Sequence, residues 1–436
     1  MKRIISGVFG ALGLAALAGC LITEAPPPSG SGYTCEGDVC TVTGPILDDT
    51  TFTSDLKWVL KGGVFVGDDL DPTARPTTLT IEPGTTIYGD TASISFLLIT
   101  RGSKIMAEGT QELPITFTSA NDEGARSRSD WGGLILNGQA PVNGCAGDPC
   151  TLQGEAGTGT YGGSNVNDNS GVLKFVRVEF PGKLIDDENE LNGISFQGVG
   201  DGTVVDFIQV HMGGDDCVEF FGGTVNAKHI VCTGIGDDNL DWTFGWTGRV
   251  QFLVAQQHGD AGDSGIEADN NEDNNTLEPF SDPVLSNVTL VGSTGQTASG
   301  HGVLLRRGTK ATLENFVVMG WDKSCLDIDD EASLGFAGTD ITVQNSIFDC
   351  EDLSPEEDGD PIVVEDFVTN GPGNVIGAAG LADPNNTALP NFKPADGSPA
   401  LSGAVIPADA FFDDVEFKGA MGAEDWASDW CKFPAN

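Results

Sequence analysis

Carboxylate side chains recur at fixed positions of a short phrase that the chain repeats six times between Glu190 and Glu331. The copies begin at intervals of 24, 22, 26, 37 and 23 residues, starting at Glu190, Gly214, Gly236, Gly262, Ser299 and Asp322. If the copies stack in register, their carboxylates form columns. The first column holds Glu219, Asp241 and Glu267, and the preceding turn adds Asp215, Asp237 and Asp263, with Asp216 and Asp238 beside them.

Stacked carboxylates need a partner of opposite charge. At about 4.8 Å and an effective dielectric of about 20, two neighbours repel by roughly 3.5 kcal/mol. Calcium fits this spacing, because two Ca–O bonds of about 2.4 Å span about 4.8 Å. The neighbouring segment 260–273 adds further oxygens, including Asn270 and Asn271. We therefore expect Ca²⁺ as the cofactor, with the ligands Asp215, Glu219, Asp237, Asp241, Asp263, Glu267 and Asp269; the alternative is a solvated acidic face.

Catalysis would need more than the columns. Arg306 falls between Asp269 and Asp329 in the next column, where it could act as a base or anchor a substrate anion. Asp327 continues the column of Glu219 and could join an acid/base pair of the glycosidase type. Arg306 and Asp327 are therefore weak catalytic candidates. The alternative for Arg306 is that it only neutralises its two acidic neighbours.

The repeat period indicates the elements that carry these residues. A period of twenty-odd residues built on short alternating strands is typical of a solenoid, whose coils bury a shared core. Alternation separates inward from outward positions. It predicts outward Glu219, Asp241, Glu267, Leu304 and Asp327, and inward Val218, Phe220, Leu240, Trp242, Ile266, Ala268, Val303, Leu305, Leu326 and Ile328.

The rest of the chain continues the same pattern. β-Branched residues alternate with polar ones from Ile46 to Ser119, and each run ends at Gly or Pro. Long helical periodicity is absent after the first twenty residues. We predict one all-β domain over 46–436, a solenoid of stacked coils. The closing segment 411–430 is expected to cover the final coil, because an open sheet edge there would be exposed.

The first twenty residues have the form of an export signal, with Lys2 and Arg3 before a short apolar run. LAGC at 17–20 resembles a bacterial lipobox, which implies cleavage after residue 19 and lipidation of Cys20. Leu21, rather than Asp, after the cysteine favours the outer membrane. Residues 20–45 are expected to form a lipidated tether with a disulfide loop. The alternative is a signal anchor or an ordinary secretory peptide.

The composition limits the partners. The formal charge is −44, or −46 without Lys2 and Arg3. A field of this sign repels nucleic acid and attracts cations. We therefore expect no nucleic acid partner. The expected partners are the membrane, through the lipid on Cys20, and a polysaccharide or an envelope protein.

Nine cysteines remain besides Cys20, and export permits disulfides. Cys35 with Cys40 and Cys145 with Cys150 share the pattern C-x-G-D-x-C and are expected to close small loops. Cys217 with Cys232 and Cys325 with Cys350 are the simplest remaining pairs, and Cys431 is left over. The pair Cys217–Cys232 conflicts with the alternation, which places Cys217 outward and Cys232 inward.

Six phrases together resemble one family. They are LTIEPGTTIYG, RGSKIMAEGT, PITFTSA, WGGLILNGQAPVN, DDCVEFFGGTV and FFDDVEFKGAMG. They are similar to phrases of Gram-negative surface lipoproteins and secreted proteins with a pectin-lyase-like right-handed β-helix. The resemblance implies the fold; it does not imply a single function, because this fold carries lyases, hydrolases, adhesins and scaffolds. We expect a non-catalytic ligand- or partner-binding scaffold, with a polysaccharide lyase or hydrolase and a structural or adhesive protein as alternatives.

Overall fold

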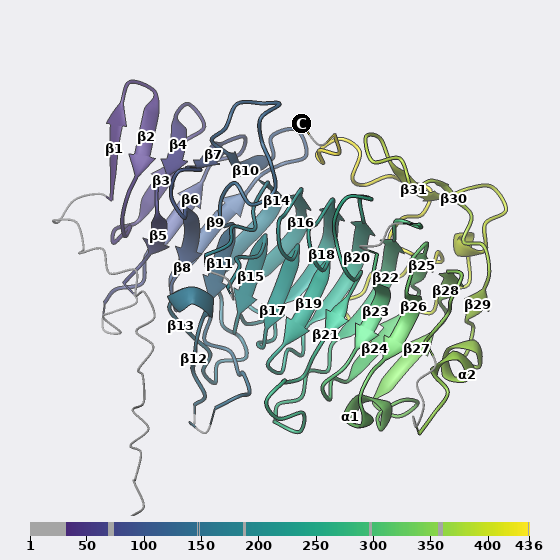
Figure 1. Cartoon of the computed structure of the whole chain (residues 1–436). Helices are drawn as coiled ribbons and strands as arrows, with labels where there is room; N and C mark the ends of the chain where they lie inside the picture. Colours follow the sequence, from purple (N-terminus) through teal and green to yellow (C-terminus); the bar gives the residue numbers. More distant parts are fainter. Residues whose placement is uncertain are drawn as a thin grey trace, which may run out of the picture.

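The chain winds into a parallel β-helix, as predicted (Figure 1). The computed structural model describes residues 32–68, 74–145, 147, 149–185, 189–295, 299–355, 361–434 and 436. Two parallel sheets run along the solenoid, and each coil contributes strands to both. The core lies between them, and it is formed from the inward residues of both sheets.

The smaller sheet has nine strands, one from each coil, and it carries the repeated phrase. Its strands are mostly four residues long and pair in register with the coils on either side. They are β5 (Gly63–Val66), β8 (Phe96–Ile99), β11 (Leu134–Asn137), β15 (Ile194–Gln197), β17 (Val218–Phe221), β19 (Leu240–Thr243), β21 (Glu267–Ala268), β23 (His301–Leu305) and β26 (Ser324–Ile328).

The larger sheet has eighteen strands, the longest of them in its middle. These long strands are β14 (Gly171–Glu179), β16 (Val204–His211), β18 (Asn226–Thr233), β20 (Arg249–Gln256) and β22 (Val284–Val291). Before them come β1 (Tyr33–Glu36), β2 (Val39–Val42), β3 (Thr50–Phe52), β4 (Lys57–Leu60), β6 (Thr78–Ile81), β7 (Thr86–Gly89), β9 (Lys104–Glu108) and β10 (Ile115–Ser119). After them come β24 (Ala311–Glu314), β25 (Val317–Met319), β27 (Ile341–Gln344), β28 (Ile347–Asp349) and β29 (Val375–Ile376).

The predicted inward positions are confirmed. Leu240 and Trp242 have no solvent exposure, and the other eight predicted inward residues are at most 1% exposed. Trp246 and Trp321, which lie near turns, are also buried. Their indole N–H groups donate to the carbonyl oxygens of Val225 and Leu290. The two tryptophans are therefore core residues and cannot contact a surface ligand.

A bend divides each long strand at one residue in the left-handed region. These residues are Phe175, Phe207, His229, Phe252 and Asn287, with φ between 49° and 65°. Non-glycine residues rarely adopt this conformation. The four aromatic side chains among them form a stack along the solenoid, with ring centroids 4.4 Å apart for Phe175 and Phe207, 4.1 Å for Phe207 and His229 and 4.9 Å for His229 and Phe252. Aromatic contacts between neighbouring coils thus help to stabilise the bends.

The hairpin of β1 and β2 belongs to the solenoid. β2 pairs in parallel with β4, and Cys40 and Val42 are buried in the main core. We expected residues 20–45 to form a lipidated tether with a disulfide loop, but within this segment β2 is part of the solenoid. The reason is that β2 provides apolar residues at alternate positions and pairs with an otherwise open sheet edge.

Four disulfides are present in the described residues, and they include both loops that we predicted. These are Cys35–Cys40 and Cys145–Cys150, and the other two are Cys217–Cys232 and Cys325–Cys350. Our doubt about Cys217 was wrong: it is fully buried in the main core. It lies in the turn before β17, where strand alternation does not apply. Cys431 is a free thiol among the described residues.

Short helices and small hairpins occupy the loops and the ends. The helices are α1 (Glu331–Leu334), α2 (Val364–Thr369), η1 (Glu155–Gly157) and η2 (Pro399–Leu401), and the hairpins are β12 (Leu152–Gln153) with β13 (Thr160–Tyr161) and β30 (Leu381–Asp383) with β31 (Asn391–Pro394). Val364 and Val368 of α2 pack on the main core, and β29 pairs with β28. α2 and β29 therefore cover the final coil. Within the described residues, no helix is both long and apolar enough to span a membrane.

The closing segment does not cover the final coil, contrary to our prediction. Residues 404–434 and 436, which we call the C-terminal strap, run back along the outer side of the larger sheet (Figure 1, yellow). Amide side chains hold the strap through both of their polar atoms. Gln209 bonds the N–H and carbonyl of Lys432, Gln251 those of Asp413, and Asn315 those of Val405. At these three residues the backbone N–H and C=O groups of the strap thus find hydrogen-bond partners without pairing as a strand.

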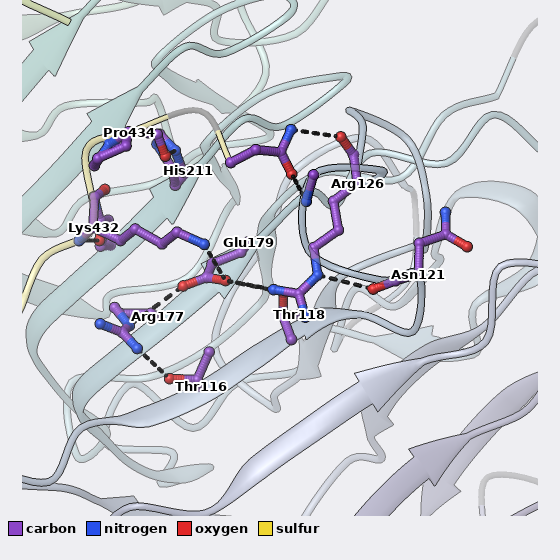
Figure 2. Close-up of polar contacts among 12 residues, drawn as sticks. Thr116, Thr118, Asn121, Arg126, Arg177, Glu179, His211, Lys432 and Pro434 are labelled. Carbon is purple, nitrogen blue, oxygen red and sulfur yellow. Dashed lines mark hydrogen bonds and ion pairs between the residues drawn. The ribbon is translucent and has the colours of Figure 1, made fainter. Parts of the chain in front are cut away.

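A buried carboxylate fixes the end of the strap. Glu179 is 2% exposed and accepts a hydrogen bond from Thr118. Figure 2 shows three cations around it: Lys432 of the strap at 3.8 Å, Arg126 at 3.9 Å and Arg177 at 3.5 Å. A buried charge needs such partners, because desolvation alone would be costly. Lys432, near the C-terminus, therefore has a structural role.

The core assignment can be tested by a pair of adjacent substitutions. Leu240→Asp should lower the free energy of unfolding by about 3 kcal/mol or more, because it buries an unpaired charge. Asp241→Asn should cause no loss when divalent cations are absent, because it removes repulsion on the outward side. Urea denaturation in the presence of a chelator measures both. Equal losses for the two variants would contradict the assignment of inward and outward positions.

Candidate metal centre

The strand register brings the predicted carboxylates together. Glu219, Asp241 and Glu267 are direct partners in the pairing of β17, β19 and β21. Asp327 continues the same column but is separated from Glu267 by Leu304. The ladder therefore covers three consecutive acidic coils, and Asp327 lies outside it.

The turns before these strands add a second layer of carboxylates. Four groups of three place one oxygen from each residue within 4.8 Å of the other two. The groups are Asp215/Asp216/Asp237, Asp216/Glu219/Asp241, Asp237/Asp238/Asp263 and Asp238/Asp241/Glu267. We call these eight residues the acidic ladder. Consecutive groups share members, so the oxygens form a continuous row and not separate clusters.

The ladder is more enclosed than a solvated face. Asp216 and Asp238 are 7% and 4% exposed, and Glu219, Asp241 and Glu267 are half-buried. Asp237 is exposed, so the row is open to solvent along the outer column. This arrangement gives an ion access while it limits the water available to the inner carboxylates.

Two inner carboxylates also connect the coils. One oxygen of Asp216 accepts a hydrogen bond of 2.9 Å from the backbone N–H of Asp238. One oxygen of Asp238 accepts an equivalent bond of 2.5 Å from Ser264. These bonds fix the turn geometry from one coil to the next. At the N-terminal end of the ladder, the Asn192 side-chain amide donates a hydrogen bond to Glu219.

Positive side chains lie at one end of the ladder. Arg306 pairs with Glu267 and with Asp269, at 2.8 Å from the latter, and Lys323 lies 3.5 Å from Asp263. Arg307 is in the following turn and pairs with Asp269 at 2.7 Å. Every Lys and Arg except Lys2 and Arg3 falls within the described residues. Among these described residues, none forms an ion pair with Asp215, Asp216, Glu219, Asp237, Asp238 or Asp241.

The missing counter-charge affects how these groups ionise. Burial, together with the charges of Glu190 and Asp237, raises the pKa of Asp215 to about 8. Burial, followed by the charges of Glu219 and Glu267, holds the pKa of Asp241 well above its usual range. Burial also raises the pKa of Glu267 to about 6, although Arg306 opposes the shift. The carboxylates thus take up protons when no other cation neutralises them.

Two further carboxylates, which we did not predict from the sequence, belong to the site. Burial is the largest cause of the raised pKa of Asp215, and the charge of Glu190 raises it further. For Glu219, burial is again the largest cause, and the charge of Glu155 in η1 adds to it. Glu190 begins the first copy of the repeated phrase, so its position along the coil was a usable signal. Glu155 lies in the loop between β12 and β13, outside any repeat. No sequence pattern connects it to the ladder.

The catalytic candidates have other roles in the structure. Burial acts to lower the pKa of Arg306, but the charges of Asp269 and Glu267 outweigh it and raise the pKa. This makes Arg306 a poor base. Arg306 neutralises Asp269, one of the two acidic neighbours that we expected it to neutralise, and its second partner is Glu267. Asp327 is 8% exposed and lies 3.9 Å from the ring Nδ1 of His301.

The comparisons with known proteins agree with the fold. The solenoid of short parallel strands is the β-helix class of architecture. A family model described as "Pectate-lyase like beta helix domain" matches residues 44–385, so the chain belongs to that family. No curated protein matches the chain, and no solved structure matches it.

The raised pKa values predict a specific dependence on pH. In the presence of a chelator, protonation of Asp215 should stabilise the fold at low pH, and this contribution should be lost as the pH rises from about 4 to about 8. The folded state binds more protons than the unfolded state in this window. Urea denaturation at several pH values should therefore show a weaker fall in stability for Asp215→Asn than for the parent. Identical slopes for the two proteins would contradict the shift.

Proposed function

We propose that this chain is an outer-membrane-anchored β-helix lipoprotein, and that its acidic ladder binds calcium. The calcium-stabilised solenoid acts as a surface scaffold for a ligand or partner. The observation that carries the proposal is the row of four overlapping oxygen triads. Within the described residues, no Lys or Arg forms an ion pair with Asp215, Asp216, Glu219, Asp237, Asp238 or Asp241. A divalent cation supplies the missing charge.

The chemistry of the ladder favours calcium over other metals. All the grouped ligands are carboxylates, which are hard oxygen donors and suit Ca²⁺ or Mg²⁺. Zinc prefers Cys or His, and neither residue is among the eight. Mg²⁺ requires near-ideal octahedral geometry and keeps several waters, whereas Ca²⁺ accepts six to eight oxygens in flexible arrangements. A dense row on a fixed backbone suits the more tolerant ion.

Calcium should stabilise the folded chain by mass action. Binding to the folded state alone gives about 2.7 kcal/mol at a hundred times the dissociation constant. Millimolar calcium should therefore raise Tm, and a chelator should lower it. Replacing Asp241 by Asn together with Glu267 by Gln should remove most of this increase. Thermal unfolding followed by circular dichroism measures each case.

Two controls separate a site from general screening. Sodium chloride at matched ionic strength should raise Tm less than calcium does, because screening lacks site geometry. The double variant Asp122→Asn with Glu123→Gln changes the net charge equally at exposed positions outside the ladder. It should keep the full response to calcium. Equal shifts with calcium and sodium chloride in the parent would leave only a solvated acidic face.

Glycoside hydrolysis is the second function that the site supports. Asp216, Glu219 and Asp241 each bring one oxygen within 4.8 Å of the others, and retaining hydrolases use a pair of neighbouring carboxyl groups. Carboxylates with raised pKa values can supply the required acid. Release of reducing ends from a polysaccharide would identify a hydrolase, and unsaturated products absorbing in the ultraviolet would identify a lyase. Binding without either product supports the scaffold, and neither binding nor product supports a structural or adhesive role.

The membrane anchor is a separate part of the proposal. LAGC at 17–20 supports lipidation, but Cys20 and the signal segment 1–19 lie outside the described residues. The first strand of the described residues, β1, begins at Tyr33. Residues 20–32 would thus connect a lipid on Cys20 to the β1–β2 end of the solenoid. The acidic ladder, in the middle of the solenoid, would then be held away from the membrane.

Replacement of the lipidated residue tests the anchor. Cys20→Ser should abolish incorporation of a radioactive fatty acid and release the protein from the membrane fraction. Cys431→Ser is the matched control, because it removes the free cysteine of the folded part, and it should leave labelling unchanged. Continued labelling of the Cys20→Ser protein would refute the assignment.

A further inference from the structure

We propose that the acidic ladder holds two divalent cations, one in each interval between its three acidic coils, and that Asp237 and Asp241 bind both. This inference rests on the calcium binding proposed above. It adds the number of ions, their positions and the carboxylates that they share.

The repeat defines two equivalent intervals. In the first interval, Asp215, Asp216 and Glu219 of one coil face Asp237 and Asp241 of the next, and two of the four triads lie here. In the second interval, Asp237, Asp238 and Asp241 face Asp263 and Glu267, and the other two triads lie here. The second set is the first displaced by one coil. An arrangement of oxygens that suits a cation in one interval is therefore repeated in the other.

The coils on either side limit the row to these two intervals. Toward the N-terminus, the three positions of the ladder are occupied by Leu191, Asn192 and Ser195. Toward the C-terminus they are occupied by Gly300, His301 and Leu304. Neither coil supplies a carboxylate at these three positions. The Glu190 carboxylate, one residue before Leu191, interacts with Asp215 and therefore adds to the first interval without forming a third one. Three acidic coils enclose two intervals, which sets the number of equivalent ions at two.

Two buried oxygens provide an independent indication of a ligand. Asn192 and Ser264 occupy the same coil position as Asp216 and Asp238, and they are 2% and 0% exposed. Asn192 Oδ1 and Ser264 Oγ have no hydrogen-bond partner, although both are inaccessible to solvent. The other atom of the Asn192 amide bonds Glu219, so this side chain lies against the ladder. Ser264 donates its backbone N–H to Asp238, so this residue also lies beside the ladder. Buried oxygens without a hydrogen-bond donor beside a row of carboxylates are suitable cation ligands.

The charges agree with two ions. Six carboxylates lack an ion pair with any Lys or Arg of the described residues, and one divalent cation would leave most of that charge uncompensated. Arg306 and Lys323 neutralise only the C-terminal end of the row. Glu267 is shared between Arg306 and the second interval. The ion in the second interval should therefore bind more weakly than the ion in the first.

Counting the bound ions tests the proposal. The detergent-solubilised full-length protein is dialysed to equilibrium against radioactive calcium, from micromolar to millimolar, in about 0.15 M sodium chloride to screen diffuse binding. We expect two calcium ions per chain in the saturable phase. One ion per chain, or three or more, would overturn the two-ion proposal and leave calcium binding intact. No saturable binding would overturn both.

Single substitutions assign each ion to its interval. Glu219→Gln should remove the first ion and Glu267→Gln the second, so each variant should bind one. Asp241→Asn removes a shared ligand and should weaken both ions tenfold or more. Asp122→Asn with Glu123→Gln should still bind two. Loss of both ions in Glu219→Gln or Glu267→Gln, with an unchanged circular dichroism spectrum, would overturn the assignment.

Discussion

In-register stacking of parallel coils is the constraint on which the rest of this structure depends. Each residue of a strand lies beside its equivalent in the next coil, at about 4.8 Å. For apolar residues this is favourable, because Leu240 and Trp242 extend a continuous core. For acidic residues the same register is costly, because Glu219, Asp241 and Glu267 cannot move apart along the solenoid. The backbone that builds the core therefore also concentrates the charge.

Within the described residues, this repulsion is relieved in only part of the row. Arg306 and Lys323 pair with Glu267 and Asp263 at the C-terminal end, and the backbone N–H groups of Asp238 and Ser264 bond the inner carboxylates. Elsewhere the same chain shows how it treats a buried carboxylate that needs no ligand. Glu179 lies within 4 Å of three cations and accepts a hydroxyl hydrogen bond. The contrast indicates that the uncompensated charge of the ladder is suited to an ion from solution.

Features that repeat with the coil were predictable from the sequence, whereas contacts between distant segments were not. Strand alternation identified the inward residues and the column of Glu219, because both are properties of one coil. Cys217 was misjudged because it lies in a turn, where the period of two does not hold. The strap was placed on the wrong surface, because its partners Gln209, Gln251 and Asn315 are distant in sequence and carry no common motif. Glu155 was missed for the same reason.

The enclosure of the ladder bears on the choice between binding and catalysis. A hydrolase needs one protonated and one ionised carboxylate on either side of an open space for the sugar. Here the inner carboxylates are packed against one another, and overlapping triads leave the closest oxygens within 4.8 Å. Such a row has little room between its members for a glycosidic bond, but it already has the spacing of oxygens around a calcium ion. Because Arg306 is held as a cation by Asp269 and Glu267, it cannot readily serve as a base beside the row. The geometry therefore favours a bound ion over bond cleavage, and any chemistry on a polysaccharide would have to use the exposed outer column at Asp237.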